Sequence, residues 1–432
     1  MNVILLSGGS GKRLWPLSND IRSKQFIKIF KKNGSDEYES MVERIYRGLT
    51  EAMPGTTVTV ATGKAQVSSI RNQLGDNVNI CVEPARRDTF PAICLAAAYL
   101  KDVLNISESE PVVVCPVDPL VEAGYFTAIK CLGEAAALGD SNLYLMGIKP
   151  TYPSEKYGYI ITNDNDRVKA FKEKPDIETA KKYLDEGAYW NGGVFAFKLG
   201  YVLKKAHEYM DFTDYRDLYE KYETVTKISF DYAVAEKENL ISVIPYSGEW
   251  KDLGTWNTLT EAMAENTFGK ATLDDTCENT HVVNELDIPI LGMGLKDVVI
   301  AASADGILVA DKGQSSYMKP YVEKLTGPIM YAEKSWGSYQ VMDIGPESNT
   351  VKVTLLPGHR MNYHSHERRD EVWNIIEGEG KVVLDDEERP VSTGDVIYIP
   401  IGVKHTIMAD TLLKVIEVQI GKDISAGDKI KY

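Results

Sequence analysis

The chain has 432 residues, of which 44% are hydrophobic and 26% are charged. This balance is typical of a folded globular protein of roughly two to four domains, and it argues against a disordered or fibrous chain. The formal net charge of −15 argues against a general nucleic-acid binder or a binder of anionic membranes, because such proteins are normally basic.

The N-terminus and the cysteines indicate the compartment. The apolar run Val3–Leu6 follows Met1 without a basic region and is followed at once by glycines, which is not the pattern of a signal peptide. No run reaches the about 18–20 apolar residues that a membrane helix needs. The five cysteines are widely spaced and form no CxxC pair, as expected for reduced thiols. We therefore expect a cytoplasmic protein.

Short apolar runs alternate with helical patterns over the first ~260 residues. This alternation predicts an α/β domain with a mostly parallel, Rossmann-like sheet, in which ligands gather at the carboxyl ends of the strands. The predicted strands are Val3–Leu6, Thr57–Ala61, Val112–Cys115, Leu143–Met146 and Val194–Phe197, and the predicted helices include Pro91–Leu104 and Ile177–Glu186.

The pattern changes after Phe268. Residues 269–325 contain strand-like pieces and few helix patterns, and we interpret them as a β-rich linker. Residues 326–432 consist of short strands and turns at regular spacing, which predicts a small antiparallel β-barrel or sandwich. The predicted domains are therefore 1–268, 269–325 and 326–432. The strands predicted beyond residue 268 are Val298–Ala301, Gly306–Val309, Tyr339–Asp343, Thr350–Leu355, Val372–Glu377, Lys381–Leu384, Asp395–Ile399 and Leu413–Gln419.

A glycine-rich segment directly follows the first predicted strand. Gly8, Gly9 and Gly11 allow the backbone to approach a phosphate closely, and Lys12 and Arg13 place positive charge where a triphosphate would lie. The spacing matches neither the P-loop nor the GxGxxG pattern. A glycine turn with two solvated basic residues is the alternative. The basic Lys24 farther on favours the phosphate site.

With further motifs in the same order, the chain resembles the sugar-1-phosphate nucleotidyltransferases, specifically the bacterial mannose-1-phosphate guanylyltransferases. Each motif alone is weak, whereas the ordered set is specific and covers the chain nearly end to end. The motifs are Ser7–Ser18, Lys24–Phe26, Glu83–Ala92, Val117-Asp118, Tyr157–Ile160, Phe171–Pro175, Trp190–Phe195, Asp231–Val234 and Trp250–Trp256.

The resemblance implies a reaction in which a sugar-phosphate oxygen attacks the α-phosphorus of a nucleoside triphosphate and pyrophosphate leaves. Such a site aligns two polyanions and neutralises developing charge, often with a carboxylate-held Mg²⁺. The implied Mg²⁺ ligands are Asp118 and Asp252. The implied catalytic residues are Arg13, Lys24, Asp118, Lys174 and Asp252; the nucleotide contacts are Gly8, Gly9, Gly11, Lys12, Arg13, Lys24, Arg87 and Asp118; the sugar-phosphate contacts are Gly158, Glu173, Lys174 and Asn191.

Two departures from the family pattern lie near the nucleotide region. Asp88 stands where an asparagine is usual, and Pro119 stands where a histidine usually follows the metal aspartate.

The expected product is GDP-mannose, for polysaccharide biosynthesis. The alternatives are the same chemistry with another base or sugar, a bifunctional enzyme with mannose-6-phosphate isomerase activity in the C-terminal region, and a non-catalytic nucleotide-sugar-binding scaffold. The expected partners are small-molecule substrates and a second copy of the chain in a homodimer, without nucleic acid or membrane.

The C-terminal region resembles the cupins. In a strand, alternate residues share a face, so His364 and His366 point to the same side, and Glu371 and His405 complete a three-histidine, one-carboxylate set. Such a set suits Zn²⁺, Mn²⁺, Fe²⁺ or Ni²⁺. Related two-domain proteins carry mannose-6-phosphate isomerase activity in this half. This chain has Val372 where a histidine is usual and lacks the arginine of the family tail, so we expect weak or no isomerase activity.

Overall fold

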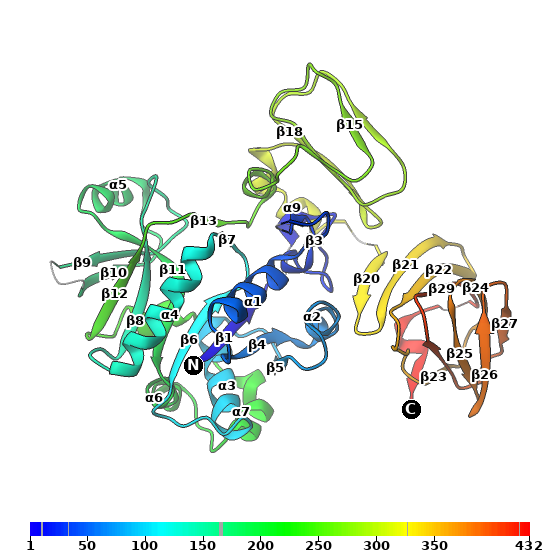
Figure 1. The fold of residues 1–432 in the computed structure, drawn as a ribbon, viewed down its shortest axis with the longest axis horizontal. Helices are drawn as coiled ribbons and strands as arrows, with labels where there is room; N and C mark the ends of the chain where they lie inside the picture. Colours follow the sequence, from blue (N-terminus) through cyan, green and yellow to red (C-terminus); the bar gives the residue numbers. More distant parts are fainter. Residues whose placement is uncertain (10–11, 33, 164–166, 326, 423) are drawn as a thin grey trace. The chain divides into compact units, whose positions relative to one another are not determined.

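The computed structural model describes residues 1–9, 12–32, 34–163, 167–325, 327–422 and 424–432 (Figure 1). Two compact units are present. The first consists of Met1–Gly9, Gln25–Val67 and Asn77–Gly254, and the second of Ser10–Lys24, Ser68–Asp76 and Thr255–Tyr432. Two short N-terminal segments therefore group with the C-terminal part of the chain, while the domain boundaries at 268 and 325 stay predictions.

A nine-stranded sheet forms the centre of the first unit. β1 pairs in parallel with β4 and β6, and β4 pairs in parallel with β5. β11 pairs antiparallel with β6, β8 and β9, so the sheet is parallel at its core and mixed beyond it. The strands are β1 Asn2–Ser7, β4 Thr57–Gly63, β5 Asn79–Glu83, β6 Pro111–Pro116, β8 Leu143–Ile148, β9 Tyr159–Thr162, β10 Val168–Lys172, β11 Tyr189–Lys198 and β12 Ile241–Tyr246.

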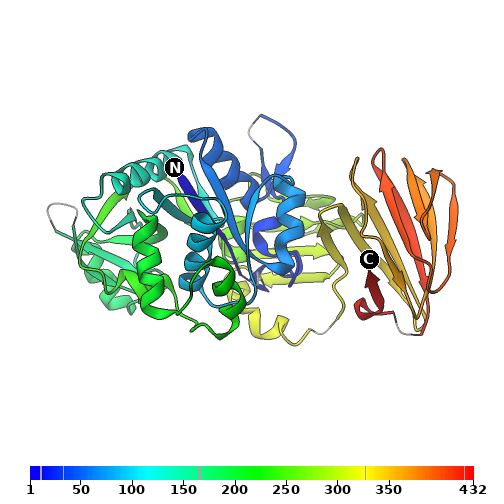
Figure 2. The same ribbon diagram turned by 90° about the horizontal axis from the view of Figure 1, so that it is seen from below.

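Helices cover both faces of this sheet (Figure 2). Val112 and Val114 of β6 face one core with the alanine-rich helix α3 and with α6. A Cβ added to Gly133 of α4 would lie 3.3 Å from Val113, so α4 covers the opposite face. Asp88 caps α3 by accepting a bond from Thr89 N at 2.8 Å. The helices of this unit are α1 Met41–Ala52, α3 Thr89–Asp102, α4 Ala123–Leu138, α5 Ile177–Asp185, α6 Leu199–Tyr209 and α7 Tyr215–Lys221. Helix α2 Val67–Leu74 belongs, apart from its first residue, to the segment Ser68–Asp76 of the second unit.

Two small antiparallel ladders complete the first unit. β7 pairs with β13, and β2 pairs with β3. The first ladder places Asp252 opposite Pro119, which directly follows Asp118. These strands are β2 Phe30–Lys31, β3 Tyr38–Glu39, β7 Pro119–Val121 and β13 Trp250–Asp252.

The second unit begins its C-terminal part with a short parallel β-coil. β14, β16 and β18 are parallel neighbours, β15 pairs in parallel with β17, and β19 closes the coil in the antiparallel sense. The predicted β-rich linker therefore consists mainly of parallel strands. The sequence pattern did not specify how these strands pair. The elements are α8 Trp256–Thr260, β14 Thr267–Phe268, β15 Ala271–Leu273, β16 His281–Asn284, β17 Ile290–Gly292, β18 Val298–Ser303, β19 Gly306–Asp311 and α9 Lys319–Val322.

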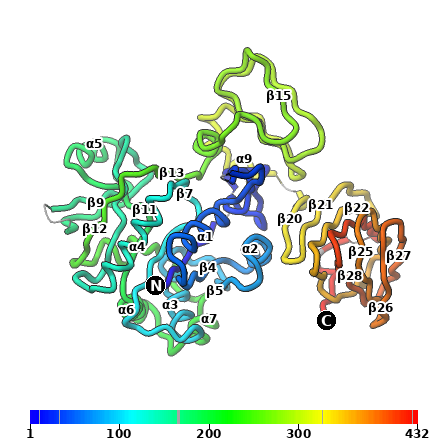
Figure 3. The backbone as a smooth tube through the Cα atoms, viewed as in Figure 1, coloured from blue at the N-terminus to red at the C-terminus, as the bar shows by residue number. Residues whose placement is uncertain are grey.

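Two antiparallel sheets form the C-terminal part of the second unit (Figure 3). Their orders are β20-β21-β22-β29-β24-β27 and β26-β25-β28-β23-β30. Val353, Trp373 and Ile397 of one sheet and Val382 and Ile407 of the other share one buried core. The strands are β20 Tyr331–Lys334, β21 Gly337–Ile344, β22 Ser348–Leu355, β23 His364–His366, β24 Asp370–Glu377, β25 Glu379–Leu384, β26 Glu387–Ser392, β27 Val396–Ile399, β28 His405–Ala409, β29 Leu413–Ile420 and β30 Lys429–Lys431.

The predicted fold class is confirmed: an α/β unit with a parallel core is followed by a β-rich, cupin-like region. Each strand predicted from an apolar run overlaps an observed strand, as Val112–Cys115 does with β6. Within the described part of the chain, no helix has the length and apolar character needed to cross a membrane.

A bidentate ion pair fastens the segment Ser10–Lys24 within the second unit. Arg22 Nη1 and Nη2 donate to the two carboxylate oxygens of Glu285 at 2.7 and 2.9 Å, and the guanidinium lies 5.1 Å from the centroid of the Tyr331 ring. Only 6% of the Arg22 side chain is exposed. Removing one partner of such a pair leaves a desolvated charge without compensation.

We expect Arg22→Ala to lower the free energy of unfolding by about 2 kcal/mol, below the fully buried range because Glu285 keeps some exposure. Urea unfolding measures the difference. Lys296→Ala, which removes an exposed pair with Glu278, is the control and should cost less than about 1 kcal/mol. Equal losses in the two variants would contradict the importance of the Arg22 pair.

Candidate functional site

A cavity of about 240 Å³ in the first unit brings together residues from distant parts of the chain. It lies beyond the end of β6 and includes the β7–β13 ladder. This is the carboxyl-end position at which open α/β sheets bind ligands. The predicted site residues that line it are Asp118, Gly158, Glu173, Asn191 and Asp252.

The β7–β13 ladder explains why Asp118 and Asp252 meet. The two residues are 134 positions apart in the sequence (252 − 118), yet the register places Asp252 opposite Pro119. Both aspartates line the same cavity. Paired carboxylate oxygens are the ligands that Mg²⁺ prefers, so this donor set fits a divalent cation.

A side chain at position 158 would displace the carboxylate of Glu173. A Cβ there would lie 2.5 Å from Glu173 Oε2 and 3.2 Å from the Phe171 ring. The Gly158 carbonyl accepts a hydrogen bond from Asn191 N at 2.8 Å, which joins this loop to β11. Glycine therefore lets this loop approach Glu173 closely without moving its carboxylate.

Lys174 and Glu173 form an ion pair beside the cavity. Lys174 Nζ lies 2.6 Å from Glu173 Oε1, and the side chain of Glu173 is only 8% exposed. Burial lowers the pKa of Lys174, but the hydrogen bond with Glu173 and the negative charges of Glu173 and Asp231 together outweigh burial and raise it. Lys174 has a φ of 44°, a left-handed conformation that is costly for a residue other than glycine and is typical of functional positions.

Asp231 lines the same cavity, although the sequence assigned it no role. Asn191 Nδ2 donates to Asp231 Oδ1 at 2.7 Å. The residue was recognisable only as part of a family motif, because an aspartate before an apolar Ala-Val pair also marks an ordinary helix start. Tyr157 and Trp250 add aromatic walls, with their ring centroids 5.4 Å apart.

The glycine-rich segment is divided between the two units. Gly8 and Gly9 directly follow β1 in the first unit, and a Cβ added to either would meet no described atom within 4 Å. Gly9 has a φ of 119°. Its carbonyl accepts a hydrogen bond from Gln66 Nε2 at 3.1 Å. Gly11, a predicted nucleotide contact, lies outside the described residues.

Three of the four predicted cations of the nucleotide site, Lys12, Arg13 and Lys24, belong to the second unit. Lys12 and Arg13 form a 3-10 turn, and Lys24 begins another. Lys12 Nζ lies 3.6 Å from Asp20, and Arg13 is exposed. In the first unit, Arg87 is not among the residues that line the 240 Å³ cavity.

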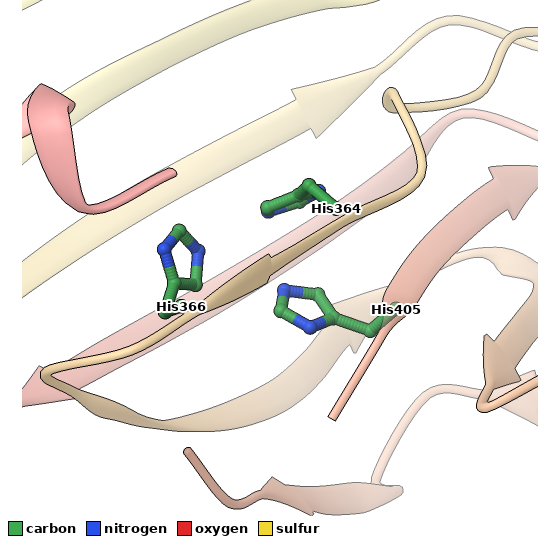
Figure 4. Close-up of side chains that lie close together, drawn as sticks. All are labelled: His364, His366 and His405. Atoms are coloured by element: carbon green, nitrogen blue, oxygen red, sulfur yellow. The ribbon is translucent and has the colours of Figure 1, made fainter. Parts of the chain in front are cut away.

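Three histidines converge in the cupin-like region (Figure 4). His364 and His366 come from β23 and His405 from β28, and one ring nitrogen of each lies within 4.8 Å of the others. The Nδ1 atoms of His364 and His405 lie 2.6 and 2.9 Å from the backbone carbonyls of Asn362 and Val403. Since a carbonyl only accepts, these Nδ1 atoms carry the protons and each Nε2 keeps a lone pair for a metal.

Burial supports the same interpretation. It lowers the pKa of His364 to about 3, so this ring is neutral at physiological pH. His405 Nε2 is buried, makes no hydrogen bond with a described residue and lies 3.4 Å from Glu371 Oε2. His366 Nε2 lies 3.0 Å from Glu371 Oε1. The three imidazoles supply nitrogen donors and the Glu371 carboxylate lies beside two of them, so the donor set suits a borderline divalent metal.

Arg369 and Trp373 position the Glu371 carboxylate. Arg369 Nε donates to Oε1 at 3.0 Å, and Trp373 Nε1 donates to Oε2 at 3.1 Å. Arg369 Nη2 also lies 3.1 Å from His366 Nε2. The sequence did not assign Arg369 a role, although its position two residues before Glu371 places it on the same face of the strand.

A cavity of about 620 Å³ opens beside His364. Arg369, Glu417 and Lys429 are among the residues that line it. Burial raises the pKa of Glu417 to about 8, and burial lowers the pKa of Lys429 to about 8 against the attraction of Glu417. Lys429 was not predicted as a site residue, because the interpretation of the C-terminal tail rested only on the family arginine that the tail lacks.

Known proteins resemble the chain along nearly its whole length. Residues 2–268 match the family model described as nucleotidyl transferase, and residues 329–432 match the model described as mannose-6-phosphate isomerase C-terminal. A mannose-1-phosphate guanylyltransferase of Salmonella montevideo is 28% identical over 99% of this chain and 98% of its own. Xanthan biosynthesis protein XanB of Xanthomonas campestris pv. campestris (strain B100) is 29% identical over 99% and 97%.

A solved structure is similar as well. The crystal structure described as mannose-1-phosphate geranyltransferase from Thermus thermophilus has a TM-score of 0.63 and 27% sequence identity. The match covers 75% of this chain and 98% of the Thermus chain.

Proposed function

The chain belongs to the nucleotidyl transferase family, and we propose that it forms GDP-mannose and pyrophosphate from GTP and mannose 1-phosphate. The cavity that joins Asp118 and Asp252 to Gly158, Glu173 and Asn191 carries this proposal, because it combines a carboxylate pair with polar groups suited to a sugar. The names of the similar proteins supply the choice of guanine, mannose and polysaccharide biosynthesis.

In this proposal, Asp118 and Asp252 hold Mg²⁺, which neutralises charge on the phosphates when it is bound. A phosphate oxygen of the sugar attacks the α-phosphorus, and the bond to the pyrophosphate oxygen breaks. No protein nucleophile takes part, so the residues act by aligning the two substrates. Glu173, Asn191 and the Gly158 backbone bind sugar hydroxyls.

The cations of the site divide between the two substrates. Lys174 binds the sugar phosphate. The groups proposed to bind the nucleotide are Gly8, Gly9, Gly11, Lys12, Arg13, Lys24 and Arg87. A cytoplasmic homodimer completes the proposal, and size-exclusion chromatography of the full chain tests the dimer.

A substrate matrix tests the activity. Pyrophosphate release is measured with each of four nucleoside triphosphates and several sugar 1-phosphates in the presence of Mg²⁺. Turnover confined to GTP and mannose 1-phosphate supports the proposal. Preference for another pair would overturn the base or the sugar, and binding without turnover in any pair would favour a nucleotide-sugar-binding scaffold.

The division of the cations predicts distinct kinetic defects. Arg13→Ala is expected to lower kcat mainly, because its charge matters most as pyrophosphate leaves. Lys174→Ala is expected to raise the KM for the sugar phosphate about tenfold or more, because it removes a charged partner of the phosphate. Initial rates with each substrate varied in turn measure both effects. Equal effects on both substrates in both variants would contradict this division.

The cupin-like region is proposed to bind one Zn²⁺, Mn²⁺, Fe²⁺ or Ni²⁺ through His364, His366, Glu371 and His405. His405 Nε2, which is buried and makes no hydrogen bond within the described part of the chain, favours this second function. Isomerase activity is expected to be weak or absent, because the C-terminal tail lacks the family arginine. Interconversion of mannose 6-phosphate and fructose 6-phosphate by the metal-loaded protein decides this point.

A further inference from the structure

Asp231 is held in place by the backbone on both sides of it. It begins a π-helical turn, Asp231–Ala235, a rare geometry that is frequent at functional sites. Just before it, Phe230 N donates to Thr89 Oγ1 at 2.8 Å, and Ile228 N donates to the Arg87 carbonyl at 3.3 Å. The carboxylate therefore lines the cavity from a fixed support.

The contacts of Asp231 leave acceptor capacity on its carboxylate. Asn191 Nδ2 donates to Oδ1 at 2.7 Å, and Asn191 Oδ1 in turn accepts from Gly193 N at 3.1 Å. The amide is thus fixed from both ends, and its orientation follows from the hydrogen bonds. An ionised carboxylate offers about four acceptor positions, so one bond from Asn191 does not saturate it.

We propose that Asp231 accepts a hydrogen bond from a hydroxyl of the sugar 1-phosphate, and that with Glu173 it determines which sugar the cavity accepts. The carboxylates of Asp231 and Glu173 and the amide of Asn191 then recognise the arrangement of the sugar hydroxyls. A site that forms a hydrogen bond with a particular hydroxyl rejects a sugar that lacks it. This role rests on the proposed function and adds a specificity-determining residue to it.

The ionised carboxylate of Asp231 destabilises the fold. A residue with a purely structural role would gain nothing from carrying such a charge. Burial, and then the neighbouring Glu173 carboxylate, raise the pKa of Asp231 from 3.8 to about 6, while Asn191 and Lys174 act in the opposite direction. The other charged residues that line the cavity are Lys156, Asp118 and Asp252.

The sign of this pKa shift fixes its effect on stability. The folded-state pKa lies above the unfolded value, so the ionised side chain destabilises the fold as pH rises from about 4, in full above about 6. Hydroxyl donors of a bound sugar would relieve the repulsion between the carboxylates of Asp231 and Glu173.

Asp231→Asn separates sugar recognition from structural support. Asparagine keeps an oxygen that accepts the bond from Asn191 and removes the charge. We expect the KM for mannose 1-phosphate to rise about 10- to 100-fold, because a hydrogen bond to a charged group is lost, with the KM for GTP unchanged. We also expect the Tm at pH 7.5 to rise, and this difference to shrink at pH 5.

Asp185→Asn is the matched control, because Asp185 is an exposed aspartate at the end of α5 in the same unit. It should leave both KM values and the Tm unchanged. A lower Tm for Asp231→Asn at pH 7.5 with an unchanged KM for the sugar phosphate would overturn the proposal in favour of structural support.

A panel of monodeoxy mannose 1-phosphates identifies the contact. The penalty of Asp231→Asn should disappear for the analogue that lacks the bonded hydroxyl and persist for the others. An equal penalty for every analogue would overturn the contact. Wild-type protein without turnover on any substrate pair would instead contradict the proposed function, and tryptophan fluorescence titration with mannose 1-phosphate would then test Asp231 by binding alone.

Discussion

Asp118→Asn and Asp252→Asn are each expected to lower kcat at least about 100-fold. Both carboxylates line one cavity, and the register of β7 with β13 holds them together. A bound divalent cation contributes several kcal/mol of transition-state stabilisation, and each 1.4 kcal/mol is a factor of about ten in rate. Because asparagine has nearly the same shape, the fold should be unchanged.

Pyrophosphate release at saturating substrates and increasing Mg²⁺ measures this effect. Asp185→Asn, on the exposed end of α5, is the control and should retain wild-type turnover. Thermal unfolding checks that the variants are folded. Near-normal turnover of both variants at saturating Mg²⁺ would show that these aspartates do not hold a catalytic metal.

The second large effect is expected in the cupin-like region. The double variant His364→Ala, His366→Ala removes two of the three converging imidazoles, so the bound divalent metal should be lost. A metal that binds only the native state stabilises it by about 2.7 kcal/mol at a free concentration 100 times its Kd. The metal-dependent rise in Tm should therefore disappear in the variant.

Elemental content after chelator washing and thermal unfolding with added Zn²⁺ test this expectation. His359→Ala is the control, because His359 is a half-buried histidine of the same unit with its Nδ1 3.0 Å from the Pro357 carbonyl, and it is not one of the three converging histidines. Nucleotidyl transfer should survive in both variants, since neither removes a residue proposed to bind Mg²⁺, the nucleotide or the sugar phosphate. Equal metal content in wild type and the double variant would exclude these histidines as ligands.

The local sequence pattern was sufficient to predict the strands, and to predict which side chains of one strand lie on the same face. The apolar run Val112–Cys115 predicted β6 because a strand buried on both faces needs a continuous apolar sequence. His364 and His366 converge because alternate residues of a strand share a face. The glycine at 158 was part of a recognisable motif, and the structure adds the reason, the carboxylate of Glu173 within 2.5 Å of any Cβ.

The α/β unit, the β-rich C-terminal region and the types of the candidate residues could be predicted from local patterns, because strand and helix periodicity is encoded by residues close together in the chain. Which of the candidate residues lie next to one another depends on the folded chain as a whole. Asp231 joins Asn191 across 40 positions, and Arg22 joins Glu285 across 263. Such contacts depend on sheet register and on packing over the whole unit, and no local spacing specifies them.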